Sequence, residues 1–511
     1  MTDSERCPAL TLPQWFALFA VLAVALTLRV YRIQTEAMWY DEISSYAHLD
    51  APSLREFLTR ERVNDAAMLP LYFTVEYFWA NAFGGSVLTV RALSLICGMA
   101  TLVMLYLLGR HVHGHTAGLV AVLCAAFSKL LIYQSQEIRV YALTMLLALV
   151  SCYAFLRALE SGKRPWWALY LTANALILVT HLFAVLLVAA QGIYLLLTRY
   201  RQVRLWLVWG AVHVLFGAMP LLWMLSTDFD ALQRHTEWIP IPNIHRLVWA
   251  YYFVYAGSKL DAMDLVRHLP WGIPVHHLLG LAMMAAVFWA ILHTLKVNLL
   301  GPPDAARRFR FSSLVFLLLW LVVPPFSLFV ISRLGRPCFI ERYAVYSCFP
   351  LALLAGTAVA SVRRPAVKWT ALALLTAILA GNMVDLWRPM RPDWRAAQPV
   401  LQHLREANAQ VFSPKSDFGP AVIYYADAGK MFLNEGPDYI EAALAHAAQG
   451  GNAAIAIVEV PGVYNSADVR AALDRGGTQY AEHHYGGRWD VFIWDLSISE
   501  GQPAGALDHL D

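Results

Sequence analysis

Long apolar runs recur along this chain, and they restrict its fold more than any other feature of the sequence. Four of them, at 10–30, 117–132, 205–225 and 370–380, are apolar over most of the thickness of a bilayer, which takes about 20 helical residues to cross. In lipid such runs must be helical, because no water is present to satisfy an open backbone. We therefore predict a protein that spans a membrane several times.

Composition supports this prediction. Of the 511 residues, 59% are hydrophobic and 15% are charged, whereas soluble domains carry about 25% charged residues. The first apolar run is longer than the core of a secretory signal and lacks a cleavage site of small residues, so we expect it to be retained. The six cysteines fall mainly in apolar runs and form no CxxC pair, which argues against cysteine chemistry.

Counting apolar runs predicts about eleven membrane helices, centred near residues 20, 97, 124, 148, 172, 190, 215, 286, 321, 352 and 377. With the N-terminus inside, basic residues concentrate in alternate loops, at 157–164, 199–204, 296–310 and 363–368, as the positive-inside rule requires. This topology places four loops and the tail on the outer face, namely 31–85, 129–139, 226–275, 332–342 and the chain after 386.

Several basic residues nevertheless stand at the predicted outer boundary, against the rule: Arg29, Arg32, Lys129, Arg139, Arg333, Arg336 and Arg342. Any one of them is explained by a side chain that reaches the lipid headgroups. As a set they indicate an anionic ligand at that surface. In the loop 31–85, residues 53–59 and 71–81 have helical periodicity with aromatic faces, which suits short helices lying in the interface. Residues 238–255 form a second aromatic stretch.

The tail has a different pattern. Residues 393–407 are typical of an amphipathic helix, 453–460 and 489–495 of strands, and 466–475 of a helix capped by Ser466. Strands that alternate with helices predict a small α/β domain outside the membrane. We thus expect an α-helical membrane domain over 1–386, followed by an extracytoplasmic α/β domain over 387–511.

Polar motifs occupy the predicted outer-face segments. They are LRVYR at 28–32 with WYDE at 39–42, MLPLY at 68–72, SQEIRVYAL at 135–143, Thr180-His181, Glu341-Arg342-Tyr343 and Asp393-Trp394-Arg395. In their order and sidedness these motifs resemble those of the GT-C glycosyltransferases, in particular the protein-mannosyltransferase and aminoarabinose-transferase-like group, which includes lipid A-modifying galacturonosyltransferase-like members. The resemblance extends to about residue 400 and departs at 69–70, where the chain has Leu-Pro and the family more often has two prolines.

This resemblance implies the GT-C fold and the transfer of a sugar from a polyprenyl-phosphate carrier to an acceptor hydroxyl at the outer face. The leaving group is then a lipid phosphate, for which Arg139 and Arg342 are the candidate ligands, because a guanidinium binds two phosphate oxygens. The other candidate binding residues are Arg32, Lys129, Glu137, His181 and Tyr343.

Asp41 is the candidate catalytic base, since the attacking hydroxyl must lose a proton, and Glu42 supports it. One base without a nucleophile would invert the anomeric centre. Plain structural roles are the alternatives: Asp41 as the N-cap of a helix beginning near Ile43, Glu137 with Arg139 as an ion pair at a helix start, and His181 as a hydrogen-bond donor. No cofactor is expected, and a divalent cation is not favoured, because the carboxylates lack the spacing of an octahedral site.

The expected partners are a polyprenyl-phosphate sugar, the bilayer, and a glycolipid, glycan or protein acceptor, without nucleic acid. We expect a bacterial inner-membrane protein whose active site faces the periplasm. A flippase of lipid-linked glycans is one alternative, but it predicts charged or broken helices at the midplane and internal symmetry, whereas the ionisable residues here gather at one face. A glycan polymerase or ligase using the same donor class stays open.

Overall fold

The computed structural model describes residues 9–64, 68–226, 239–244, 246–247, 275–300, 305–381, 383, 386, 391–414, 419–428, 432–459, 465–486 and 490–497. The chain divides into two compact units. One consists of Met1–Ile33 and His48–Val384, and the other of Gln34–Ala47 and Asp385–Asp511. The division near 385 lies close to the predicted domain boundary at 386. The segment Gln34–Ala47, in contrast, groups with the tail and not with the rest of the loop 31–85.

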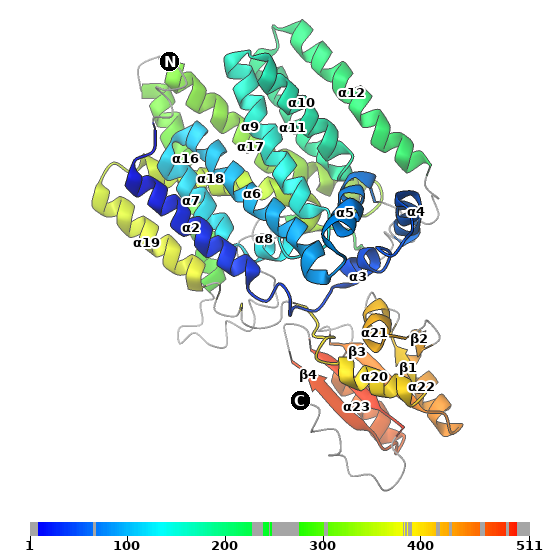
Figure 1. Ribbon diagram of the computed structural model, residues 1–511. Helices are drawn as coiled ribbons and strands as arrows, with labels where there is room; N and C mark the ends of the chain where they lie inside the picture. The colour runs from blue at the N-terminus through cyan, green and yellow to red at the C-terminus, as the bar shows by residue number, and fades with distance from the viewer. Residues whose placement is uncertain are drawn as a thin grey trace. The chain divides into compact units, whose positions relative to one another are not determined.

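The first unit is helical (Figure 1). Its helices are α2 (Leu12–Val30), α4 (Leu54–Asn64), α5 (Pro70–Phe83), α6 (Val87–His113), α7 (His115–Ala126), α8 (Lys129–Gln134), α9 (Tyr141–Ser161), α10 (Arg164–Leu178), η1 (Leu182–Ala184), α11 (Val185–Arg199), α12 (Val203–Leu225), α16 (Val275–Leu300), α17 (Ala305–Leu334), η2 (Glu341–Cys348), α18 (Phe349–Ser361) and α19 (Pro365–Gly381). Every predicted helix centre lies inside one of them, and α4 and α5 occupy the two stretches predicted as interfacial helices. The aromatic stretch 238–255 lies largely outside the described residues.

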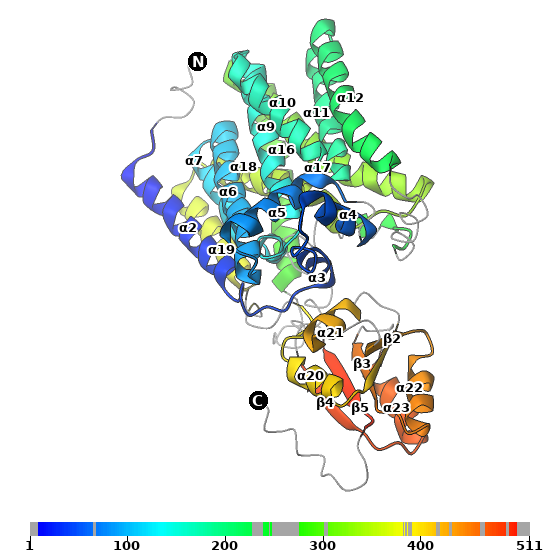
Figure 2. The ribbon, with the colours of Figure 1, turned by 45° about the vertical axis from the view of Figure 1, so that its right-hand side comes forward.

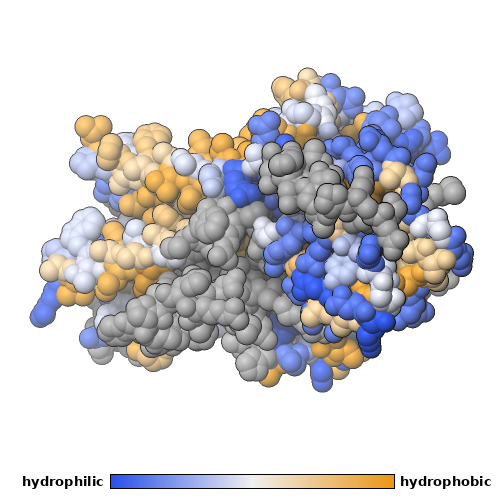
Figure 3. Space-filling view, turned by 90° about the horizontal axis from the view of Figure 1, so that it is seen from below, coloured by the Kyte–Doolittle hydropathy of each residue, from blue (hydrophilic) through white to orange (hydrophobic). Residues whose placement is uncertain are grey.

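Within the described part of the chain, seven segments are long and apolar enough to cross a membrane. They are Leu12–Val30, Val87–His113, Tyr141–Ser161, Leu182–Arg199, Val203–Leu225, Phe311–Leu334 and Glu341–Ser361. Helices α2 and α12 expose apolar side chains such as Phe16 and Leu215, which a bilayer would cover, and apolar residues gather over part of the surface in Figure 3. The chain is therefore a polytopic membrane protein.

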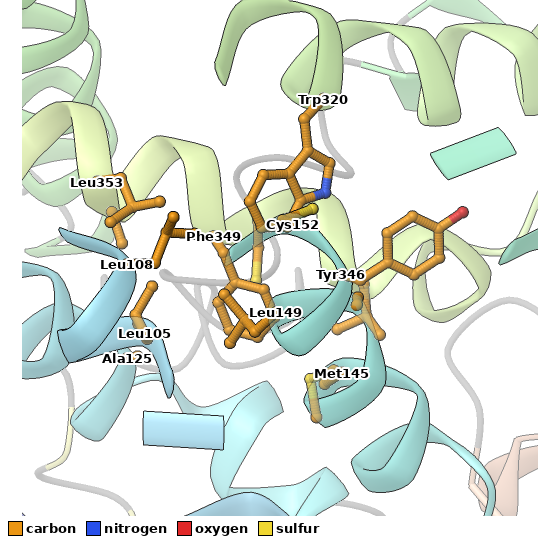
Figure 4. Packing of buried hydrophobic residues seen from close by; sticks show 14 of the residues in the cluster. Leu105, Leu108, Ala125, Met145, Leu149, Cys152, Trp320, Tyr346, Phe349 and Leu353 are labelled. Carbon is orange, nitrogen blue, oxygen red and sulfur yellow. The ribbon is translucent and has the colours of Figure 1, made fainter. Parts of the chain in front are cut away.

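The core of this unit forms where α6, α7, α9, α17 and α18 meet. Figure 4 shows side chains from these helices converging, among them Leu105, Cys152, Trp320 and Phe349, which are all buried. Glycine permits a particularly close approach of α18 to α7: a β-carbon at Gly356 would lie 2.2 Å from the carbonyl oxygen of Ala117. Small residues at such crossings are the usual way in which membrane helices pack.

The tail of the second unit is a five-stranded mixed sheet with helices on both sides (Figure 2). Its elements are α20 (Gln398–Glu406), β1 (Gln410–Ser413), α21 (Gly419–Ala426), β2 (Leu433–Glu435), α22 (Tyr439–Ala448), β3 (Ala453–Val458), α23 (Ser466–Arg475), β4 (Ala481–Tyr485) and β5 (Val491–Asp495). The strand order is β2-β1-β3-β5-β4, with β1 parallel to β2 and β3, and β5 antiparallel to its neighbours. Every residue of β3 is buried, as a central strand covered on both faces requires. Together with the membrane helices, this sheet confirms the predicted fold class.

Two local predictions in the tail need correction. Helix α23 is capped by Asn465, whose side-chain oxygen accepts from the Ala467 amide at 2.9 Å, and not by Ser466, whose hydroxyl donates to Glu459 at 3.0 Å. Helix α20 begins at Gln398 instead of 393, because Pro399 fits the first turn of a helix and the residues before it form turns.

Candidate active site

The turn between α8 and α9 carries the first half of the 135–143 motif, and its polar residues hold the helices around it. Arg29, near the end of α2, donates to the carbonyl oxygens of Ala125 at 3.1 Å and Ala126 at 3.3 Å. These carbonyls end α7 and have no partner within that helix. Ser135 accepts from Arg29 at 3.2 Å, and the side-chain amide of Gln136 donates to the Arg29 carbonyl at 2.8 Å. Arg29 is thus a structural residue, and the motif anchors α2.

The second half of this motif contributes to a group that we call the arginine–histidine cluster, formed by Arg139, Tyr141, His181, Arg342 and Tyr343. The His181 ring lies 5.8 Å from the Tyr141 ring and 5.7 Å from the Tyr343 ring. The guanidinium of Arg342 lies 5.7 Å over Tyr141. Three elements that are distant in sequence, namely the start of α9, the α10–η1 connection and η2, are brought together in this way.

His181 is uncharged in this cluster. Burial, followed by the positive charges of Arg139 and Arg342, lowers the pKa of its imidazole to about 3. Its Nδ1 atom is buried and has no hydrogen-bond partner among the residues that the structure describes. A neutral imidazole carries one donor and one acceptor nitrogen. The cluster therefore presents two permanent cations beside a neutral hydrogen-bonding ring.

Helix α5 adds Phe73 and Glu76, two residues that lie outside the motifs. Arg139 lies 5.8 Å over the ring of Phe73. Burial, then the charge of Glu76, raises the pKa of Tyr72 well above its usual value, while Arg139 acts in the opposite direction. Glu76 is fully buried. Its spacing of four residues from Tyr72 on one helix was the available sequence signal, since such residues share a face.

The remaining predicted binding residues of the first unit lie on neighbouring segments. Lys129 begins α8 and is buried, and Glu137 lies, fully buried, in the turn after α8. Arg139 stands in the turn that leads into α9, two residues before Tyr141, the first residue of that helix. Arg32 follows α2 in a left-handed conformation, with φ 60°. Glu341, next to Arg342, accepts from Arg246 at 3.0 Å, so an arginine from the 239–247 region meets η2.

Asp41 and Glu42 belong to the second unit, in the first turn of α3 (Tyr40–Tyr46). Trp39 is the N-cap of this helix, so the alternative that Asp41 caps it is wrong. Glu42 instead reaches back and accepts from the Trp39 amide at 3.1 Å. The Glu42 side chain is fully buried, and that of Asp41 is partly exposed. Among the described residues no group of three His, Cys, Asp or Glu side chains is arranged to hold a metal ion.

Comparisons with known proteins agree with these motifs. Residues 65–224, which include Arg139, Tyr141 and His181, match the family model described as dolichyl-phosphate-mannose-protein mannosyltransferase. A comparison with curated protein sequences finds no match.

Solved structures similar to this chain include the Archaeoglobus fulgidus oligosaccharyltransferase tethered to an acceptor peptide, with 11% identity and a TM-score of 0.51 over 95% of this chain and 74% of that one. ArnT from Cupriavidus metallidurans in the apo state matches with 12% identity and a TM-score of 0.42 over 94% of this chain and 98% of that one. The chain thus has the GT-C fold that its motifs predicted, and its residues 65–224 match the protein-mannosyltransferase family of that superfamily.

Proposed function

We propose that the protein is an inverting glycosyltransferase of the bacterial inner membrane. It takes a sugar from a polyprenyl-phosphate donor and transfers it to an acceptor hydroxyl at the periplasmic face. The observation that carries the proposal is the arginine–histidine cluster. The matching family model supports the donor class, because its description names a sugar carried on a polyisoprenoid phosphate.

The cluster suits a phosphate leaving group. When the bond between the anomeric carbon and the phosphate oxygen breaks, negative charge grows on the lipid phosphate. Arg139 and Arg342 are fixed cations that can each offer two N–H groups to its oxygens, and a preorganised charge of this kind stabilises a transition state strongly where water is excluded. His181 adds a neutral donor without adding charge. Tyr141 and Tyr343 supply aromatic faces beside it.

In this proposal Asp41 is the base that takes the proton from the acceptor hydroxyl as that oxygen attacks the anomeric carbon. A carboxylate is ionised at neutral pH and therefore ready to accept a proton. With one displacement and no covalent intermediate, the lipid phosphate leaves as the acceptor oxygen bonds to the anomeric carbon, and the transferred sugar has inverted configuration. No metal is required in this scheme, because the two arginines balance the phosphate charge.

Transport is a weaker alternative. The buried polar side chains that link α9, α10, α11 and α12 bond to one another. Ser151 donates to Asn174, Asn174 to Gln191 and to His213, and Gln191 to Ser151. These hydrogen bonds among uncharged side chains are explained by the packing of the four helices. They do not form a charged site for a transported glycan.

The test is sugar transfer in proteoliposomes with a panel of labelled polyprenyl-phosphate sugars. We expect one donor to lose its label to an acceptor while polyprenyl phosphate accumulates. Arg139→Ala or Arg342→Ala should lower kcat about 100-fold, and Asp41→Asn should lower kcat with the donor KM near that of the wild type.

Arg201→Ala is the matched control. Arg201 is an exposed arginine just beyond the C-terminal end of α11. Because that helix has 15 residues, Arg201 lies about 22 Å along the helix axis from the start of α11, where His181 is close by. Its activity should equal that of the wild type. A protein that moves labelled lipid across the bilayer without consuming it is a transporter, and full activity in Asp41→Asn rules out the assigned base.

A further inference from the structure

The segment Gln34–Ala47, which carries both predicted catalytic carboxylates, forms one compact unit with the C-terminal region. The contact is built around Arg391. This residue is 1% exposed, and its guanidinium forms an ion pair with Glu42, which is completely buried. The same guanidinium donates to the Ala37 carbonyl at 3.0 Å, and the Arg391 amide donates to Glu36 at 2.9 Å. A single residue of the tail therefore binds three points of the segment.

Further contacts hold the two ends of this segment. The Met38 amide donates to the hydroxyl of Tyr425 at 2.8 Å, and Arg395 donates to the Gln34 carbonyl at 2.6 Å. At the other end, the Tyr46 ring meets the edge of Tyr424 at 6.4 Å. Most of these bonds go to backbone atoms, so they fix the path of the chain as well as its side chains.

Glu42 is occupied by this arrangement. Its Oε2 atom accepts from the Trp39 amide and also pairs with Arg391. A carboxylate oxygen that is held by both an arginine and a backbone amide is engaged in fixed bonds and is not open to an acceptor hydroxyl. The Glu42 side chain is thus held in place directly beside Asp41 in the sequence. These bonds give Glu42 a structural role and leave the role of base to Asp41.

We propose that Arg391 is a positioning residue for sugar transfer: through its ion pair with Glu42, the C-terminal region sets the position of Asp41. The inference rests on the proposed function, in which Asp41 is the base. A buried ion pair is an expensive way to stabilise a fold, because desolvation offsets most of the attraction, and fixing one geometry is its better attested use. A misplacement of about 1 Å in an active site costs up to 100-fold in rate, so a rigid anchor beside the base has a catalytic effect.

The experiment compares the double variant Glu42→Gln/Arg391→Met with the wild type. The double variant removes the two charges of the ion pair together, and the introduced glutamine side chain can still accept from the Trp39 amide. We expect faster hydrogen exchange in peptides from 34–47 and unchanged exchange in peptides from α6 and α9. We expect kcat to fall about 10-fold to 100-fold, with the donor KM within about threefold of the wild type.

Two further variants keep the inference testable if the double variant does not fold. Tyr425→Phe deletes only the hydroxyl that accepts the Met38 amide, and it should increase exchange in 34–47 and lower kcat by a smaller factor. Arg391→Lys keeps the charge and should give a kcat between those of the wild type and the double variant.

The control is Arg470→Met/Glu482→Gln, which neutralises an ion pair of the same unit between α23 and β4, joined at 2.6 Å and 2.8 Å. It should leave both exchange in 34–47 and kcat unchanged. Wild-type kcat in the double variant overturns the positioning role, and unchanged exchange in 34–47 overturns the anchor itself. If the wild type uses no polyprenyl-phosphate sugar, the proposed function and the catalytic part of this inference fail together, while the exchange result still decides whether the tail holds the segment.

Discussion

The pKa of His181 depends on its burial and on the two arginines beside it. Its pKa is lowered to about 3, by burial first and then by Arg139 and Arg342. The unfolded chain has an ordinary histidine with a pKa of about 6.5. Below that pH the unfolded state binds a proton that the folded state does not, so the free energy of unfolding decreases as the pH falls from about 6.5 towards 3.

We expect His181→Gln to remove this acid sensitivity. Each pH unit in the window changes the free energy of unfolding by about 1.4 kcal/mol, so between about pH 6.5 and pH 5 the wild type should lose about 2 kcal/mol more than the variant. The measurement is the Tm of both proteins in detergent at about pH 7 and about pH 5. Equal decreases in the two proteins would show that His181 titrates as an ordinary histidine.

Sequence reasoning identified the members of the arginine–histidine cluster because family motifs mark them one by one. The sequence did not distinguish Arg29 from the cluster residues, because it shows only that a basic residue stands at the predicted boundary. The α7 carbonyl oxygens that Arg29 binds are evident only in the structure. Arg391 was missed for a related reason, because it acts on a segment from the opposite end of the chain. Glu76 was missed although its spacing of four residues from Tyr72 on α5 places the two on one face.

Among the elements, helices α9 to α12 are joined by side chains that no single helix can satisfy. Asn174 on α10 is the centre: it accepts from Ser151 on α9 and donates to Gln191 on α11 and His213 on α12. In a bilayer these bonds are what hold polar residues of neighbouring helices together, since lipid offers no alternative partner.

Asn174→Leu should therefore weaken the packing of four helices at once. The substitution removes three hydrogen bonds and leaves buried donors and acceptors without partners, which costs about 1–3 kcal/mol. Thermal unfolding in detergent would measure the loss. Asn81→Leu is the control, because Asn81 is exposed and donates to the Tyr77 carbonyl of its own helix, and its Tm should stay within about 2 °C of the wild type. A Tm for Asn174→Leu equal to that of Asn81→Leu would contradict the role of the network.

Helices were easier to predict than strands for a physical reason. A membrane helix needs a long apolar stretch, which stands out in the sequence. Every predicted centre lies inside a helix, although only seven segments of the described chain are long and apolar enough to cross a membrane. Strands β1 and β2 contain only four and three residues, and β4 alternates between exposed and half-buried positions without a buried face. Such strands are specified by their neighbours in the sheet and leave little local pattern.

At the scale of the whole molecule, the residues proposed for the reaction lie on two units that do not follow the order of the sequence. The membrane unit holds the arginine–histidine cluster, and the second unit combines Gln34–Ala47 with the tail. No periodicity or composition in the loop 31–85 indicates this grouping, because it depends on bonds to residues beyond 390.

A chain that ends at Val384 should insert into the membrane and fail to transfer sugar. Its apolar helices are intact, but Gln34–Ala47 has lost Arg391, Arg395 and Tyr425 as partners. We expect protease to cut this segment faster than in the full chain, with α6 and α9 still protected. A chain that ends at Ser497 keeps every described element and serves as the control. Full sugar transfer by the shorter chain would exclude a catalytic role for the tail.

The pairing of Gln34–Ala47 with the tail also dictates an order of assembly during synthesis. The ribosome completes this segment before helices α4 to α19 exist, while Arg391 and Tyr425 are among the later residues to be made. Until the residues beyond 390 have been synthesised, the groups of this segment lack the tail residues against which they are buried. A premature stop within the membrane region would thus yield a polytopic protein in which Asp41 and Glu42 lack the partners that the tail supplies to their segment.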